Sequence, residues 1–187
     1  NTPTPTVPPT DLVAWYTLDE SSGTTAADAS GNGLDASLVN GPTWVSGQTG
    51  NAVNLDGSND YVRMPSGIVS GLDDFTIATW VRLDTSGSWR RLFDFGTGTS
   101  VNMFLVPQSG SGTVRFAITT GGWSAEQQIN GSSTLPTGTW THVAVTKSGN
   151  TGILYVDGVE VGRNTSMTLS PSDLGNTGNN WIGRSQY

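Results

Sequence analysis

The sequence predicts an all-β fold, a two-sheet antiparallel β-sandwich, on three observations. Short stretches alternate apolar and polar residues, as in Phe75–Arg82 (FTIATWVR), a pattern typical of strands with one buried face. Gly, Asn and Asp residues separate these stretches, with no helical segment of significant length between them. Only 12% of the residues are charged and 25 are Gly, whereas a helical protein needs more Glu, Lys, Ala and Leu. Closely spaced strands of this kind predict two packed sheets.

The first expected strand is Leu12–Leu18, in which every second residue is apolar. The other strands are expected, in chain order, at Leu34–Val39, Ala52–Leu55, Tyr61–Met64, Phe75–Leu83, Arg91–Phe95, Asn102–Val106, Thr113–Thr119, Glu126–Ile129, Trp140–Lys147, Gly152–Val156, Val159–Asn164 and Trp181–Gly183. Asp157-Gly158 is the strongest hairpin signal, because Asp-Gly accepts the positive φ angles of a type I′ turn. Asp56-Gly57 is expected to act in the same way. Only Ser70–Asp74 and Ser170–Leu174 indicate a helical turn.

Composition excludes several classes of protein. The net charge of −7, from 15 acidic and 8 basic residues, disfavours nucleic-acid binding, which needs a clustered positive face. The absence of Cys and the single His exclude disulfides, zinc–thiolate sites and multi-histidine metal sites. No run is long enough to span a membrane, and no signal peptide begins at Asn1, so we expect the numbering to start inside a longer precursor.

The chain divides into a linker, residues 1–11, and one sandwich domain, residues 12–187. The segment Asn1–Thr10 (NTPTPTVPPT) alternates Pro and Thr, which favours a semi-extended spacer that cannot build a core. Such spacers separate folded modules, so another domain is expected to precede this one; a cloning remnant is the alternative. A length of 187 residues suits a single β-sandwich.

Six phrases occur in a fixed order along the chain: Trp15, Asp28–Gly33 (DASGNG), Asp60-Tyr61-Val62, Trp80, Trp140-Thr141-His142-Val143 and Tyr155-Val156-Asp157-Gly158. Together they resemble the laminin-G-like jelly rolls of the concanavalin A-like lectin/glucanase superfamily, in the branch found in multidomain secreted bacterial proteins. The resemblance covers residues 12–184. It implies a jelly roll and a secreted, extracellular location.

In that family the strand at Trp181–Gly183 is usually followed by a last strand that carries an acidic pair. This sequence ends at Tyr187, so the resemblance implies a jelly roll without its last strand and hence an open sheet edge. The alternatives are a cut fragment, a strand supplied by another segment or chain, or an unusually short member.

Three tryptophans, Trp15, Trp80 and Trp140, lie inside alternating strands, where filling the core is the most economical role for a large aromatic ring. His142 stands beside Trp140 in Trp-Thr-His-Val. We interpret it as a structural residue, because no Ser or Cys nucleophile is evident with it.

The loop Asp28–Gly33 is a candidate calcium site. Calcium prefers several hard oxygen ligands, which Asp28, Ser30 and Asn32 supply close together in a tight turn. Related modules often hold a structural cation near the first strand, and Asp19 (or Glu20) would complete the ligand shell. The alternative is an ordinary Asx turn that needs no ion.

Two other tryptophans, Trp89 and Trp123, lie beside Ser/Gly turns, where a large aromatic has less reason to be buried. An exposed Trp can stack on the C–H face of a sugar while Arg, Asn and Gln bind the hydroxyls. The predicted carbohydrate-binding residues are therefore Trp89, Arg90, Arg91, Asn102, Trp123 and Gln127. The alternative is partial burial of both rings over the sandwich edge.

The same superfamily includes retaining glycanases, which carry a Glu-x-Asp-x-x-Glu strand. The nearest segment here is Asp157-Gly158-Val159-Glu160, in which Tyr155 replaces the first Glu and a hairpin turn separates the carboxylates. No catalytic residues are therefore predicted. The expected function is a non-catalytic carbohydrate-binding module of a secreted multidomain glycan-degrading enzyme, tethered to a catalytic domain. The alternatives are a protein- or surface-adhesion module and a structural spacer.

Overall fold

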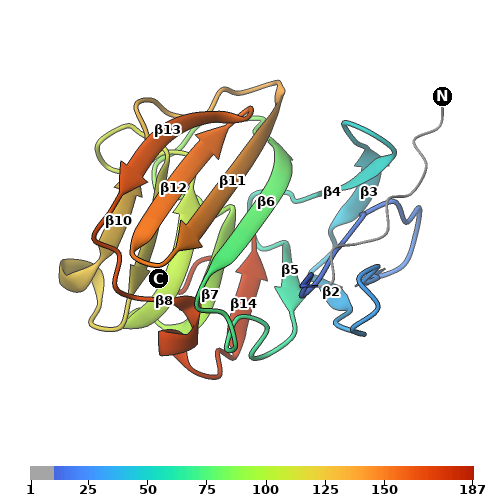
Figure 1. The fold of residues 1–187 in the computed structure, drawn as a ribbon. Helices are drawn as coiled ribbons and strands as arrows, with labels where there is room; N and C mark the ends of the chain where they lie inside the picture. Colours follow the sequence, from blue (N-terminus) through green and yellow to red (C-terminus); the bar gives the residue numbers. More distant parts are fainter. Residues whose placement is uncertain (1–10) are drawn as a thin grey trace.

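A computed structural model describes residues 11–187, so the predicted linker, apart from Asp11, lies outside the described residues. The described chain folds into two packed antiparallel β-sheets and a small separate hairpin, which confirms the predicted all-β sandwich (Figure 1). Two 3₁₀ helices, η1 (Trp123–Ala125) and η2 (Pro171–Leu174), are the helices found in this range. Among these residues, no helix has the length and apolar character needed to span a membrane.

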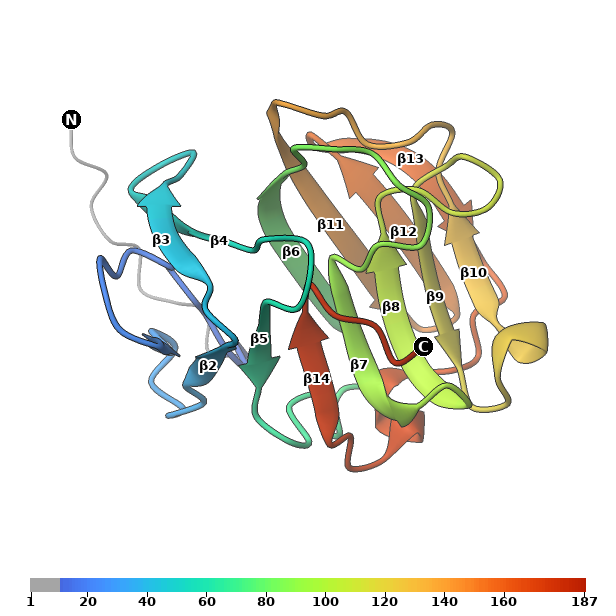
Figure 2. The same cartoon turned by 180° about the vertical axis from the view of Figure 1, so that it is seen from behind.

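The larger sheet has eight strands. In spatial order they are β1 (Thr25–Ala26), β2 (Ala36–Val39), β5 (Tyr61–Met64), β14 (Asn179–Ile182), β7 (Phe93–Gly98), β8 (Val101–Val106), β9 (Arg115–Thr119) and β10 (Gln127–Asn130). Side chains alternate along these strands, so Phe93 and Phe95 lie in the core while Asp94, between them, lies on the opposite face. We call this opposite face the outer face; residues 183–187 cross it after β14 (Figure 2).

The smaller sheet has four strands, in the order β13 (Val159–Asn164), β12 (Thr151–Val156), β11 (Trp140–Ser148) and β6 (Phe75–Arg82). Asp157 and Gly158 join β12 to β13 with φ angles of 49° and 78°. Positive φ at both central residues is the type I′ geometry, so the hairpin predicted there is confirmed. A separate hairpin of β3 (Thr43–Ser46) and β4 (Asn51–Asn54) stands beside β6 (Figure 1).

The core fills the space between the two sheets. Phe116 and Met103 from the larger sheet and Leu154 from the smaller are fully buried, and the rings of Phe75 and Phe116 lie 5.9 Å apart. Fully burying a side chain of this size contributes about 1.5–3 kcal/mol to folding. This contiguous apolar layer fixes the two sheets and, with them, the position of their edges.

One edge of the smaller sheet lies at β6. This strand pairs with β11 on one side and forms the end of its sheet among the described strands. Thr79 shares the inward face of β6 with Ile77 and Val81, which pack against the core, yet Thr79 is exposed. The space between the two sheets is therefore open to solvent beside β6.

Two predictions of local structure are wrong. Residues 12–18 form no strand of their own, and only Tyr16 makes an isolated bridge, with Asp28. Asp56-Gly57 is not a hairpin turn, because β4 pairs with β3 whereas β5 pairs with β2 and β14. Instead, the Asp56 carboxylate accepts hydrogen bonds from the backbone amides of the next residues and closes a local turn.

Candidate functional site

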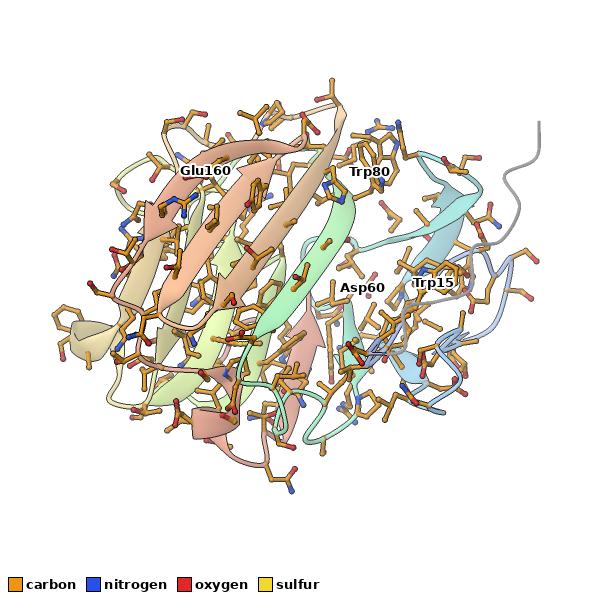
Figure 3. The ribbon with its side chains drawn as sticks, viewed as in Figure 1. Trp15, Asp60, Trp80 and Glu160 are labelled. Atoms are coloured by element: carbon orange, nitrogen blue, oxygen red, sulfur yellow. The ribbon has the colours of Figure 1, made fainter. Side chains whose placement is uncertain are left out.

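A groove of about 380 Å³ lies along the free edge of β6. We call it the tryptophan groove, because the aromatic side chains Trp15, Trp80, Trp140 and His142 line it. Its opposite wall comes from residues 15–19 and from the tip of the β3–β4 hairpin, residues 48–52. In Figure 3, Trp80 lies on β6 and Trp15 on the N-terminal segment across from it.

The aromatic rings in this groove are accessible to solvent. Trp80 is 49% exposed and Trp15 is 42% exposed, whereas Trp140 and His142 are half-buried. Trp80 and His142 are directly opposite residues of β6 and β11, and their rings meet edge to face at 5.3 Å. This pairing holds the Trp80 ring at the rim of the groove.

The prediction that these tryptophans fill the core is wrong for Trp15 and Trp80, which are exposed. In β6 the residues Phe75, Ile77 and Val81 face inward, so Trp80 has the outward parity. In β11 the residues Val143 and Val145 face the core, so Trp140 and His142, which alternate with them, point outward.

The opposite wall of the groove, besides Trp15, carries polar side chains. Asp19, Gln48, Thr49 and Asn51 line it. The Asn51 backbone amide donates to the Asp19 carboxylate at 2.9 Å, and the Asn51 side chain donates to the Asp19 carbonyl at 3.1 Å. Position 50 must be Gly, because a Cβ there would lie 1.9 Å from the Asp19 carboxylate. The groove thus combines flat apolar rings with fixed hydrogen-bonding groups.

The two tryptophans predicted to bind sugar lie far apart. Trp89 is 45% exposed, and its amide donates to the Gln108 carbonyl beyond the end of β8. Trp123 is 76% exposed and sits in η1, where the amide of Gly122 donates to Ser100 before the start of β8. A six-residue strand separates them by about 20 Å. The structure does not bring the two rings together into one platform.

The structure buries two of the predicted sugar-binding side chains, so neither lies on the exposed rim. Asn102 is 0% exposed, and its side-chain amide donates to the Gly98 carbonyl. Arg91 is 9% exposed and forms an ion pair with Asp94 at 2.9 Å. Asn102 has the outward parity of β8, and Arg91, which precedes β7, contacts the outward residues Asp94 and Phe104, but residues 183–187 cover that part of the outer face.

The last two predicted sugar-binding residues have local partners. Arg90 is exposed and donates a hydrogen bond to the Thr85 hydroxyl. The Gln127 side chain joins β10 to the segment after β13, because its amide donates to the Thr168 hydroxyl and its carbonyl accepts from the Leu169 amide.

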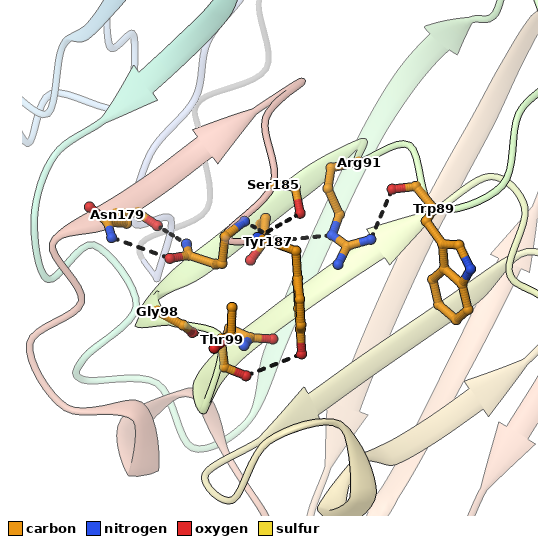
Figure 4. A network of polar contacts seen from close by, with 10 residues as sticks. Trp89, Arg91, Gly98, Thr99, Asn179, Ser185 and Tyr187 are labelled. Carbon is orange, nitrogen blue, oxygen red and sulfur yellow. Dashed lines mark hydrogen bonds and ion pairs between the residues drawn. The ribbon is translucent and has the colours of Figure 1, made fainter.

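The covering segment is held by a polar network (Figure 4). The Gln186 amide donates to the Asp94 carboxylate at 3.0 Å, and the Tyr187 hydroxyl donates to the Thr99 carbonyl at 3.1 Å. Arg91 donates to the same carboxylate and to the Trp89 carbonyl. Burial raises the pKa of Asp94, and the hydrogen bonds from Gln186 and Arg91 oppose that rise. The Asp94 carboxylate therefore ties Arg91 and residues 183–187 to the outer face.

The loop at Asp28 is organised around one carboxylate. Its oxygens accept hydrogen bonds from the amides of Trp15, Ser30 and Leu34 and from the Ser30 hydroxyl. The burial of Asp28 would raise its pKa, but these hydrogen bonds outweigh that effect and lower the pKa from 3.8 to about 2. Asp28 thus fastens the N-terminal segment, and with it Trp15, to the loop.

We expect this loop to lose stability in acid. Because the folded state lowers the pKa of Asp28, its contribution is present above pH of about 4 and is lost as the pH falls through about 2. The melting temperatures of the wild type and of Asp28→Asn should therefore differ by a constant amount at neutral pH and converge below pH of about 4. A difference that does not shrink in acid would contradict this role of the carboxylate.

Calcium binding at Asp28, Ser30, Asn32 and Asp19 stays a prediction. The Asn32 side chain donates to the carbonyls of Leu12 and Val13, and among the described residues no group of three or more acidic or His side chains could hold a metal ion. These contacts favour the Asx-turn alternative. If the loop holds calcium, a chelator should lower the melting temperature and added calcium should restore it, whereas an unchanged melting temperature would establish the plain turn.

Comparison with known proteins gives the family. The sequence profile described as the concanavalin A-like lectin/glucanases superfamily, Laminin_G_3, matches residues 56–187. A search of curated protein sequences found no match.

Among solved structures, an S-layer domain-containing protein from Clostridium thermocellum (residues 221–444) is 42% identical, with 92% of this chain and 81% of that chain covered and a TM-score of 0.57. Domain 4 of AbnA, a GH43 extracellular arabinanase from Geobacillus stearothermophilus, is 22% identical over 86% of this chain and 79% of that chain, with a TM-score of 0.73. The CBM40 of a Ruminococcus gnavus IT-sialidase is 14% identical over 63% of this chain and 67% of that chain, with a TM-score of 0.54.

The family profile covers most of the chain, and the arabinanase domain and the CBM40 share its fold. The chain therefore belongs to the concanavalin A-like lectin/glucanases superfamily, as its ordered phrases predict.

Proposed function

We propose that this domain is a non-catalytic carbohydrate-binding module that holds a glycan chain in the tryptophan groove. The observation that carries the proposal is the set of accessible rings, Trp15, Trp80 and Trp140, in one groove that also carries fixed polar side chains. An indole ring stacks well on the C–H face of a sugar, while side chains fixed by other contacts bind the hydroxyl groups. Asp19 and Asn51, which are tied to each other, are suited to that second task.

Other proteins that share this fold bind sugars. The structure of AbnA domain 4 is a complex with arabinotriose, and that of the Ruminococcus gnavus CBM40 is bound to sialyllactose. These likenesses support carbohydrate binding as a class of function, and the site in this chain is argued from its own residues. We further propose that the domain is extracellular and is tethered by the Pro/Thr linker to a glycan-degrading enzyme, whose local substrate concentration it would raise.

The carboxylates support a binding role over catalysis. Retaining glycosidases need two carboxyl groups about 5–5.5 Å apart. Among the residues that line the tryptophan groove, Asp19 is the one carboxylate, and Asp84 is the one in a neighbouring groove next to Trp140. Glu160 is engaged by Arg163 on the far strand β13 (Figure 3). We expect prolonged incubation with a panel of polysaccharides to release no reducing ends, and release by the purified domain would contradict the proposal.

A glycan array probed with the wild-type domain tests the proposal directly. We expect retention of oligosaccharides long enough to contact both Trp15 and Trp80. No retention of any glycan on the array would overturn the proposal.

A second function, protein or surface adhesion, is favoured by one observation. The free edge of β6 and the exposed inward-facing Thr79 leave space for an added strand between β6 and residues 15–19. A polypeptide strand from another segment or chain would pair with the unpaired backbone groups of β6 and cover Thr79. Hydrogen exchange distinguishes the two occupants. An added strand protects alternate β6 amides, whereas a sugar stacked on Trp80 leaves them exchanging.

A further inference from the structure

We propose that the outer face of the larger sheet is a second binding surface, and that it takes a carboxylated polysaccharide, a polyuronate. The surface carries a row of three accessible arginines, Arg63, Arg184 and Arg115, that crosses the sheet from β5 to β9, and the buried Arg91–Asp94 pair lies beneath it. Four strand spacings separate its ends, about 19 Å, which accommodates several sugar units of a polymer. The choice of a glycan as the ligand rests on the proposed function, whereas the surface itself does not involve the tryptophan groove.

The arginines gather on this face by strand parity. Arg63 points outward because its neighbours Val62 and Met64 are in the core, and Arg115 points outward because Phe116 is in the core. Arg184 follows β14 and lies over the outward rings of that part of the sheet. The row thus holds three of the eight basic residues of a chain whose net charge is −7.

The accessible arginines of this face have no carboxylate partner among the described residues. Within residues 11–187, Arg63, Arg115 and Arg184 form no salt bridge, whereas the buried Arg91 is paired with Asp94. Arg163, on the other sheet, is paired with Glu160 at 2.6 Å. The row therefore offers a local positive potential on an otherwise acidic protein.

Aromatic rings hold the guanidinium groups in place. The Arg184 guanidinium lies 4.6 Å from the Tyr61 ring centre and 4.7 Å from that of Trp181. Arg63 donates to the Tyr61 hydroxyl at 2.7 Å, and the Arg115 guanidinium lies 5.5 Å from the Trp89 ring centre. A guanidinium stacked by its face keeps its N–H edge free for a carboxylate.

A uronate fits these features better than other anions. Its carboxylate matches the planar fork of a guanidinium, and its sugar ring presents a C–H face to Trp89, which is 45% exposed. The net negative charge of the domain repels any polyanion at long range, and it repels DNA more strongly because DNA carries one charge per roughly 1.7 Å of its axis, a higher density than one carboxylate per sugar.

Affinity electrophoresis through gels containing sodium polygalacturonate, at low salt, tests the proposal. We expect the wild type to be retarded, and Arg184→Ala to weaken binding by about tenfold or more, because a charge-assisted hydrogen bond is lost. Arg163→Ala is the matched control: it removes the same charge from the other sheet and should change binding by less than about twofold. Arg63→Ala, measured in the same gels, should weaken binding in the same direction as Arg184→Ala.

Three results would overturn the proposal: no retardation of the wild type, equal losses in Arg184→Ala and Arg163→Ala, or equally strong binding of single-stranded DNA. Trp80→Ala separates this proposal from the proposed function. It should leave retardation by polygalacturonate unchanged, and a loss would mean that the anion binds in the tryptophan groove and that the arginine row is not a site. If the domain binds polygalacturonate but retains no neutral glycan on the array, the tryptophan groove is not a sugar site and the arginine row is unaffected.

Discussion

Replacing Trp80 with alanine is expected to abolish retention of the domain on its glycan while leaving the fold intact. The Trp80 ring is 49% exposed at the rim of the groove, so its removal takes away a stacking surface and little of the core. Loss of a central aromatic anchor typically costs about 2 kcal/mol of binding or more, which lowers affinity roughly 30-fold. Stability loses only the edge-to-face contact with His142, about 0.5–1.5 kcal/mol.

Two variants make this result specific to the groove. Trp80→Phe keeps a flat ring and should retain part of the affinity. Trp123→Ala removes a ring that is 76% exposed in η1, away from the residues that line the groove, and should bind as the wild type does. If Trp123→Ala loses retention and Trp80→Ala keeps it, the sugar binds at the predicted loop residues and the groove is not the site.

Replacing Asp94 with alanine is expected to cause the largest loss of stability among exposed or polar positions. The side chains of Arg91 and Asp94 are 4% and 0% exposed, and removal of the acid leaves the guanidinium buried without its partner. Breaking a buried pair in this way costs about 3–5 kcal/mol. In a domain of this size the melting temperature should fall by roughly 10 °C.

A second ion pair in the same chain is a matched control. Arg163 and Glu160 have the same spacing, three residues, but their side chains are 45% and 39% exposed. Solvent screens such a pair, so Glu160→Ala should leave the melting temperature almost unchanged. If Asp94→Ala fails to fold, the double variant Arg91→Met/Asp94→Leu, which removes both charges, should recover the fold. Equal effects of Asp94→Ala and Glu160→Ala would contradict the argument.

Strand alternation made most of the fold predictable from the sequence. The expected strand Tyr61–Met64 is found with the same bounds as β5, and the Asp157-Gly158 turn is found as expected, because both depend on local residue chemistry. The expected strand Leu12–Leu18 fails for a non-local reason. Its apolar and polar residues alternate as a strand requires, but in the structure the segment pairs through a single bridge, Tyr16 to Asp28.

The site was less predictable, because the size of a tryptophan ring favours burial while its place in the strand directs it outward. The sequence Phe75–Arg82 already places Trp80 on the face opposite Phe75, Ile77 and Val81, so its exposure could have been inferred. The burial of Asn102 could not be inferred from the sequence. It depends on residues 183–187 crossing the outer face, a contact between segments some 80 residues apart that no local pattern encodes.

The free edge of β6 also affects how the isolated protein behaves in concentrated solution. An extended segment of a second molecule that enters the groove between β6 and residues 15–19 can pair with the unpaired backbone groups of β6 and link the two molecules. The net charge of −7 opposes this approach at neutral pH. Acidification removes that repulsion and added salt screens it. Stocks of the purified protein are therefore expected to stay monomeric longest near neutral pH and at low ionic strength.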